Sequence, residues 1–279
     1  MALSVSTAFT TLFDAEVKQA YQATRKLAGL VRERDAAGAS TVKFPKLGSG
    51  VATVRTPQSD VVPISATYSV ATATMADYGA FEYSDIFNQS HVNFNDRQEL
   101  VQLVGNAIGR RMDQVVIDAL DAAGSPQTVA NSIGGSNTNI NVAKIREAAK
   151  KLNAKTVPPD NRVLLIHANG LANLLSEAQA TSVDYVATRA LLDGSVDSYM
   201  GFRVVVMGDL DEGGLTVDGS SDRTCYAFHR NAVGLGMAMN QQTRVDYVAE
   251  KTSYLVGSTF SAGAISIEDN GIIKITARE

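Results

Sequence analysis

The chain has 279 residues, enough for one large domain or two modest ones. Hydrophobic residues make up 45% and charged residues 19% of it, which excludes a wholly disordered chain and a coiled-coil array. The net charge of −4 argues against a protein that wraps duplex DNA, and no apolar run is long enough to cross a membrane. The single cysteine, Cys225, excludes an intrachain disulfide and a cysteine-built zinc site.

The first forty residues predict an arm that leads into a helix. Residues 1–13 are uncharged and rich in Ser and Thr, with scattered apolar side chains. Asp14 can cap a helix, and apolar residues recur at helical spacing from Val17 to Val31. We therefore expect a helix that ends near residues 36–38. Its charged face indicates either a solvated surface or an arm that lies across a neighbouring subunit.

Residues 41–80 predict a hairpin with little apolar surface to bury. Strands are expected over 41–44, 51–55 and 64–75, with a turn at 56–60. Small and polar residues crowd both faces of the last of these strands. Such a hairpin would be marginal alone, so we expect it to depend on a contact outside its own domain.

The clearest helix signal in the chain follows Asn95. Asn95 and Gln98 form a capping-box pattern, apolar residues recur at helical spacing, and residues 124–126 end the pattern. A helix over 96–123 would be about 42 Å long and would span a whole domain. The segment 81–87 before it predicts a strand or the start of a helix, and 124–140 after it predicts a loop.

The remainder of the chain predicts a mixed α/β domain and a run of strands. Asn141 can cap a helix, and strands and helices then alternate. The expected elements are a strand over 162–167, a helix that begins at 170–175, strands over 202–207 and 224–228, and tail strands over 245–248, 252–256, 264–267 and 272–275. Asn270 and Gly271 are typical of a hairpin turn, so we expect the last two strands to pair with each other.

No catalytic motif occurs in the sequence. The phosphate-binding loops, the nucleophile elbow and the His-Glu-x-x-His zinc motif are all missing. His167 ends an apolar strand and Cys225 lies inside one, where core residues are the better interpretation. The acidic loop at 209–214 begins like a calcium loop but has Gly213 at the third ligand position. We therefore expect no catalytic residue, no cofactor and no metal, and a protein that is not an enzyme.

The order of these elements resembles that of the major capsid proteins of tailed phages, the Hong Kong 97 fold, and in particular the podovirus type. The segments that carry the resemblance are 41–48 and 77–85 at either end of the hairpin, 93–120 in the long helix, and 199–204 and 228–235 in the α/β part.

The resemblance implies an α+β fold with five parts. They are an N-arm and helix over 1–40, an extended E-loop hairpin over 41–80, a P-domain with a spine helix over 81–140, an α/β A-domain over 141–243, and C-terminal strands over 244–279 that return to the P-domain and A-domain core. It also implies a major capsid protein that self-assembles into an icosahedral shell around double-stranded DNA.

The resemblance further implies the partners of the chain. These are other copies of itself in hexamers and pentamers, a separate scaffolding protein and a portal, with a cement protein possible. Packaged DNA would be touched only by weak, non-specific contacts, and no membrane would be involved. The expected location is the virion capsid, assembled in the host cytoplasm.

Two features depart from the family pattern. Some members carry a long N-terminal scaffolding segment, whereas only 13 residues precede the first expected helix here, so we expect a separate scaffolding protein unless a segment has been removed. Some members crosslink an E-loop lysine to an asparagine of a neighbour, but here no lysine occurs between Lys46 and Lys144. We therefore expect no such crosslink.

Two alternatives to a phage capsid remain at this point, an encapsulin-like nanocompartment shell and a soluble α/β enzyme. For a shell protein, basic side chains are candidates for ion pairs between subunits, although each could equally be solvated. The candidates are Arg55 at the hairpin tip and the further arginines Arg25, Arg32, Arg34, Arg110 and Arg111.

Overall fold

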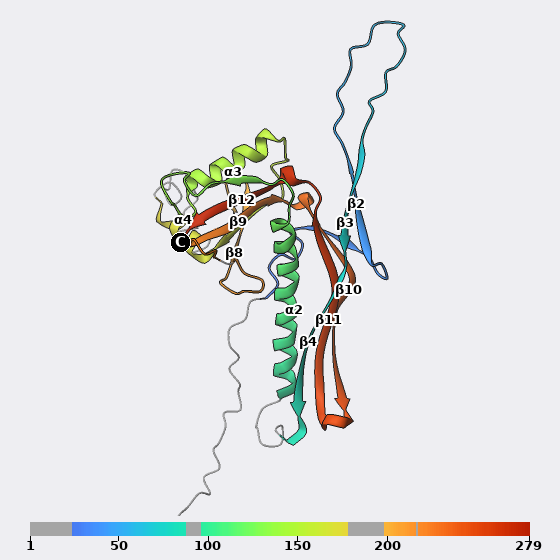
Figure 1. The fold of residues 1–279 in the computed structure, drawn as a ribbon, viewed down its shortest axis with the longest axis vertical. Helices are drawn as coiled ribbons and strands as arrows, with labels where there is room; N and C mark the ends of the chain where they lie inside the picture. Colours follow the sequence, from blue (N-terminus) through green and yellow to red (C-terminus); the bar gives the residue numbers. More distant parts are fainter. Residues whose placement is uncertain (1–23, 88–95, 178–197, 216) are drawn as a thin grey trace, which may run out of the picture.

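A computed structural model describes residues 24–87, 96–177, 198–215 and 217–279. The molecule has a body, a long limb below it, and an extension that projects above it (Figure 1). Among the described residues, none of the helices has the length and apolarity that a membrane span needs.

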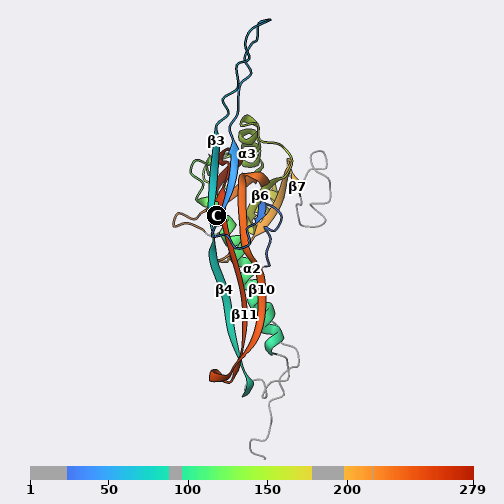
Figure 2. The same cartoon turned by 90° about the vertical axis from the view of Figure 1, so that its right-hand side faces the viewer.

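The limb is a helix laid along one face of a four-stranded sheet. Figure 2 shows its three long strands side by side. The helix is α2 (Asp96–Asp121), and the strand order is β1 (Arg32–Asp35), β10 (Val233–Val248), β11 (Ser253–Ser266) and β4 (Ala76–Asp85). The Tyr78 ring of β4 stacks on Phe260 of β11 with 5.0 Å between ring centroids. Arg111 of α2 lies 4.7 Å from the centre of the Tyr78 ring and so joins helix to sheet.

The body is a six-stranded mixed sheet covered by two helices. The strand order is β5 (Gln127–Val129), β12 (Ile272–Arg278), β9 (Asp222–His229), β6 (Arg162–His167), β8 (Phe202–Met207) and β7 (Ser198–Tyr199). The helices are α3 (Val142–Ala154) and α4 (Ala168–Ser176). Every residue of β6 is buried, so this strand lies at the centre of the core. The Asn141 side chain caps α3 by accepting the Lys144 N–H at 2.8 Å.

The extension is an antiparallel pair of strands whose base is fixed to the limb. The strands are β2 (Thr41–Leu47) and β3 (Tyr68–Thr74), and residues 48–67 run on beyond them. Phe44 of β2 is fully buried, and its ring covers Gly234 of β10 so closely that a Cβ there would lie 2.7 Å from the ring. The backbone of Thr74 crosses Gly263 of β11 in the same way. Small residues on the limb therefore let the base of the extension approach its backbone.

Most of the predicted elements are confirmed. The long helix, the helix capped by Asn141 and the strands over 162–167, 202–207 and 224–228 are all present, each within a few residues of its expected bounds. The segment 81–87 belongs mostly to a strand, β4, which begins earlier at Ala76.

The helix predicted between Asp14 and residue 36 is wrong where the structure describes the chain. Residues 24–31 form no regular element and β1 follows, while 14–23 lie outside the described residues. The carboxylate of Asp113 on α2 accepts the N–H groups of Lys26 and Leu27 at 2.7 and 3.0 Å. Leu27 and Val31 are buried as their spacing suggests, but distant residues supply the hydrogen bonds that a helix would have made internally.

Three strand predictions are also wrong. Residues 51–55 form no strand, and the predicted loop at 124–140 contains β5. The turn at Asn270 and Gly271 does not close a hairpin, because β11 belongs to the limb sheet while β12 pairs with β9 and β5 in the body. A 3₁₀ turn, η3 (Asp269–Gly271), links the two sheets instead.

The contact between Phe44 and Gly234 predicts that a single methyl group will loosen the extension. We expect Gly234→Ala to lower the free energy of unfolding by about 1–3 kcal/mol, since the ring is buried and has nowhere to move. Chemical denaturation and limited proteolysis within residues 41–75 would measure it. Gly208→Ala is the control, because a Cβ there meets nothing within 4 Å. Equal stability of the two variants would show that this contact does not anchor the extension.

Candidate intersubunit surfaces

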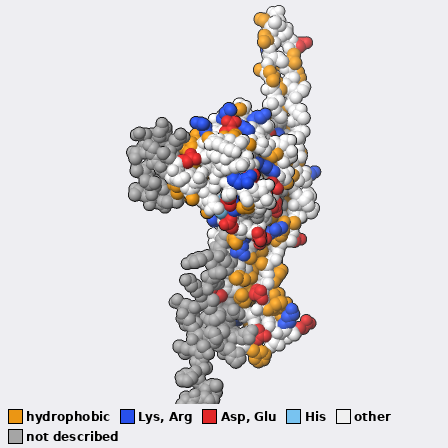
Figure 3. All heavy atoms as spheres, turned by 60° about the vertical axis from the view of Figure 1, so that its left-hand side comes forward, with side chains coloured by type: hydrophobic (Ala, Val, Ile, Leu, Met, Phe, Trp, Pro, Cys, Tyr) orange, Lys and Arg blue, Asp and Glu red, His pale blue; other side chains and the backbone are white. Residues whose placement is uncertain are grey.

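The extension exposes apolar side chains along its whole length. Val54 is 99% exposed and Val51 83%. Hydrophobic atoms follow the projecting segment in Figure 3. Between Leu47 and Ala76 the only charged residues are Arg55 and Asp60. The other exposed large apolar residues of the extension are Leu47, Val61, Val62, Ile64, Tyr68 and Val70. Many exposed apolar side chains on one projecting segment indicate an interaction site.

The outer part of the extension does not pair with itself. The ladder of β2 and β3 continues only as far as the Gly48 N–H, which donates to the Thr67 carbonyl at 2.8 Å. Beyond it the one backbone hydrogen bond within the described segment closes the turn from Ser59 to Thr56. Pro63 lacks an N–H, so the returning arm cannot supply a full ladder. Among the described residues, the backbone of the outgoing arm therefore has no hydrogen-bond partner beyond Gly48 except in the turn at 56–59.

A second apolar surface lies on the sheet face of the limb that turns away from α2. The Phe81 ring rests across Gly79 and Gly257, where an added Cβ would lie 2.6 Å from it. Phe81 and Tyr83 are 57% and 42% exposed. The Lys251 ammonium sits 4.0 Å from the centre of the Tyr83 ring. We call Phe81 and Tyr83 the aromatic patch.

The predicted contact arginines do not gather in one place. Arg55 lies far out on the extension and makes a single long hydrogen bond of 3.5 Å, to the Ser59 carbonyl. Arg32 and Arg34 are exposed beside the base of the extension, where Arg34 donates to the Lys43 carbonyl at 3.2 Å. Arg32 lies 5.9 Å from the centre of the Phe44 ring.

The other three arginines face the limb and have partners in their own chain. Arg25 forms an ion pair of 2.8 Å with Glu33. Arg111 lies 3.5 Å from Glu212, and Arg110 on the same helix is half-buried. Ion pairing between subunits stays a prediction for all six.

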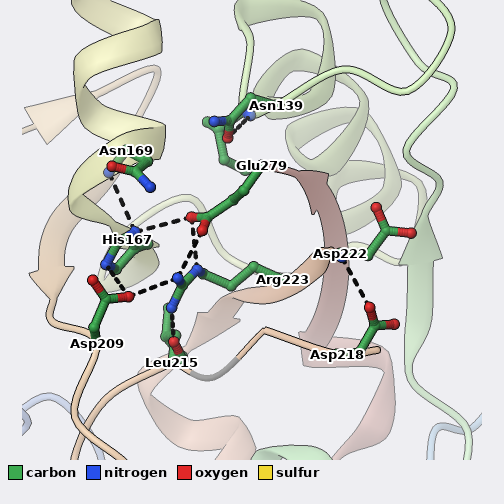
Figure 4. A network of polar contacts seen from close by, with 10 residues as sticks. Asn139, His167, Asn169, Asp209, Leu215, Asp218, Asp222, Arg223 and Glu279 are labelled. Carbon is green, nitrogen blue, oxygen red and sulfur yellow. Dashed lines mark hydrogen bonds and ion pairs between the residues drawn. The ribbon is translucent and has the colours of Figure 1, made fainter. Parts of the chain in front are cut away.

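An ionic network, with Arg223 and His167 buried and Asp209 largely exposed, ties the C-terminal strand to the centre of the body (Figure 4). Arg223 of β9 is 3% exposed and donates to both oxygens of Glu279 and to Asp209, each at 2.7 Å. His167 lies between the same two carboxylates, 3.0 Å from each. The hydrogen bond from Arg223 holds the pKa of Glu279 below its usual range. The arrangement agrees with a structural role for His167.

Two other ionisable groups, Lys144 and Cys225, are buried in the core. The Lys144 ammonium is fully buried and donates to the carbonyls of Thr138 and Thr276, and burial lowers its pKa to about 8. Burial raises the pKa of Cys225 to about 12, so the thiol stays protonated and behaves as a core residue. Within the described ranges, no three His, Cys, Asp or Glu side chains gather closely enough to hold a metal ion.

Comparison with known proteins gives one family and many related structures. The family model described as phage capsid protein matches residues 5–279. None of the curated proteins compared with the chain gives a match.

Solved structures similar to this chain include phage capsids with low sequence identity. The capsid of the cyanophage P-SCSP1u has 14% identity and a TM-score of 0.76, with 98% of this chain and 94% of that one covered. A chain of Mycobacterium phage Che8 has 16% identity and a TM-score of 0.74, with 97% of both covered. The head of Helicobacter pylori phage KHP40 has 12% identity and a TM-score of 0.74, with 95% and 94% covered. This chain thus has the same α+β fold.

The ionic network predicts a specific dependence of stability on pH. A carboxylate whose pKa is depressed on folding stabilises the fold above its unfolded pKa of about 4.5, and this contribution is lost as pH falls through the folded pKa. We expect Glu279→Gln to lower the free energy of unfolding at pH 7 by about 2–3 kcal/mol and to flatten its fall in acid. Urea denaturation between pH 3 and 7 measures both.

The control is Glu250→Gln, at an exposed position on the distal hairpin of the limb. If Glu279→Gln leaves the dependence of unfolding free energy on pH unchanged, Glu279 does not contribute to stability in acid.

Proposed function

Since this chain belongs to the phage capsid protein family, we propose that the extension of each copy lies on a neighbouring copy and holds the shell together. The protein is a major capsid protein, and its place is the shell of the virion. The family match favours a phage shell over a cellular nanocompartment and over a soluble enzyme. The podovirus type stays a prediction.

The observation that carries this proposal is the uncovered apolar surface of the extension. Val51 and Val54 are almost fully exposed, and burying a valine side chain stabilises a contact by roughly 1.5 kcal/mol or more. In the free subunit these side chains contribute almost no hydrophobic stabilisation, because they are exposed to water. In a shell, a neighbouring subunit can bury them. The same small contact is then repeated at every symmetry-related position.

The parts of the chain correspond to the domains expected from the capsid fold. We assign the extension to the E-loop, the limb with α2 to the P-domain, the body to the A-domain, and residues 1–40 to the N-arm. Because β10 begins at Val233 in the limb sheet, we place the end of the A-domain near that residue instead of at 243.

The partners follow from the same assignment. We propose hexamers and pentamers of this chain in an icosahedral shell around double-stranded DNA, assembled in the host cytoplasm with a separate scaffolding protein and a portal, and with room for a cement protein. The net charge of −4 supports weak, non-specific contact with the packaged DNA. The lack of a lysine between Lys46 and Lys144 supports a shell without the lysine–asparagine crosslink of the E-loop.

Shortening the extension should separate folding from assembly. The variant replaces residues 49–66 by an Asn-Gly turn, which joins Gly48 to Thr67 where their backbones are already hydrogen-bonded. We expect the purified full chain, with scaffold, to form shells visible by negative-stain electron microscopy. The short variant should keep the melting temperature of the free subunit and form no stable shells. Shells of normal yield and stability from the short variant would contradict the proposal.

Reversing the one positive charge between Leu47 and Ala76 should weaken the shell alone. We expect Arg55→Glu to lower the melting temperature of assembled shells and to leave that of the free subunit unchanged, because Arg55 has little contact with its own chain. Arg146→Glu, at an exposed arginine of α3, controls for the change in net charge. An Arg55→Glu shell as stable as the wild-type shell would exclude an ion pair at this position.

A further inference from the structure

We propose that the ion pair between Lys46 and Glu268 holds the extension at a fixed angle to the body, and that this angle controls how readily subunits assemble. The inference rests on the proposed function, in which the extension reaches a neighbouring copy. It goes further by naming two positioning residues inside the subunit, whichever surface of the neighbour receives the extension.

The ion pair is the outermost polar contact between the extension and the rest of the described subunit. Side chains of a strand alternate between two faces, so Val42, Phe44 and Lys46 share one face of β2. Val42 and Phe44 are buried, while the Lys46 ammonium forms an ion pair with Oε2 of Glu268. Beyond it, no hydrogen bond or ion pair among the described residues joins 47–67 to another part of the chain.

Glu268 is itself held firmly, at the connection between the limb and the body. Its N–H donates to the Ala232 carbonyl at 3.2 Å, and its carbonyl accepts the Gly271 N–H at 3.0 Å. The Asn270 side chain donates to Oε1 at 2.9 Å, which leaves Oε2 for Lys46. Burial acts to raise the pKa of Glu268, but the hydrogen bonds outweigh it and hold the pKa below its usual range. The carboxylate is therefore charged at neutral pH and fixed in position.

A cavity of about 610 Å³ lies beside the ion pair, between the extension and the body. It is lined by residues 46–49 of the extension and by residues 155–158 after α3, and Glu268 also contributes to its surface. Side chains do not pack across this space as they do in a protein core. The ion pair is therefore the contact that resists rotation of the extension toward the body about the buried Phe44 ring.

The length of the extension converts a small rotation at its base into a large displacement at its tip. The outgoing arm runs from Leu47 to Pro57 and would span about 33 Å when extended. A rotation of about 10° then moves the tip by about 6 Å, close to two residues along a strand. A contact between subunits would lose its register under such a shift. The side chains of Lys46 and Glu268 are 37% and 35% exposed, so the pair can affect assembly much more than the stability of the subunit.

A distance between two spin labels tests the angle directly. Thr67→Cys places one label at the outer end of the paired strands, and Ala172→Cys places the other on an exposed position of α4. The thiol of Cys225 is buried and stays unlabelled. We expect a narrow distance distribution in the free subunit. Lys46→Glu and Glu268→Lys should each broaden it, and the double exchange, which restores a pair of opposite charges, should narrow it again.

Assembly should follow the angle. We expect each single exchange to raise the subunit concentration needed for scaffold-assisted assembly roughly two- to fivefold, and the double exchange to reverse this rise. The melting temperature of the free subunit should change little, because the pair is partly exposed. Lys155→Gln is the control, since Lys155 lines the same cavity but is not the partner of Glu268.

An unchanged distance distribution in both single variants would overturn the positioning role. A distribution that the double exchange fails to narrow, or an altered angle with unaltered assembly, would overturn it as well. The proposed function would survive these results if the short-extension variant still failed to assemble. Normal assembly of the short-extension variant would contradict the proposed function itself.

Discussion

The packing of the Phe44 ring on the backbone of Gly234 fixes the position of the extension relative to the limb. It fixes the base of a strand pair against a sheet that has no side chain at that point, so the direction of the extension is set by the limb. Beyond Gly48 and Thr67, the described chain of the extension forms almost no backbone hydrogen bonds with itself. The subunit therefore combines a fixed base with an outer segment that only another molecule can cover.

The rest of the subunit keeps that base rigid. α2 has 26 residues and runs about 39 Å along the limb, where Arg111 and Arg97 lie over tyrosine rings of the sheet. In the body, the network around Arg223 joins β9 to the end of β12 and to the loop at Asp209. Removing Glu279 would leave the buried charge of Arg223 poorly compensated, so the network favours a single arrangement of these elements.

The sequence predicts the regular elements well where a segment supplies its own hydrogen bonds. The long helix and the helix capped by Asn141 are examples, because periodic apolar residues and end signals are local. Residues 24–35 were predicted wrongly for the opposite reason, since Asp113 and β10 satisfy their backbone from far away in the chain. The turn at Asn270 and Gly271 is also a local feature. The sheet that the next strand joins, however, depends on tertiary contacts with β9.

The candidate surfaces were only partly predictable. The composition of residues 41–80 predicts that they need a contact outside their own domain. The exposure of Val51 and Val54 agrees with this prediction. The packing of the Phe81 ring on Gly79 and Gly257 could not be predicted from the sequence, because the two glycines lie on different strands. The same holds for Arg223 and Glu279, which are 56 residues apart.

Hydrogen exchange of the extension in the free subunit and in the assembled shell tests the central claim most directly. Backbone amides within residues 49–66 should exchange at nearly unprotected rates in the free subunit and be strongly protected in the shell. Protection already present in the free subunit, or free exchange in the intact shell, would contradict the account, because the extension would then be covered by its own chain or by nothing.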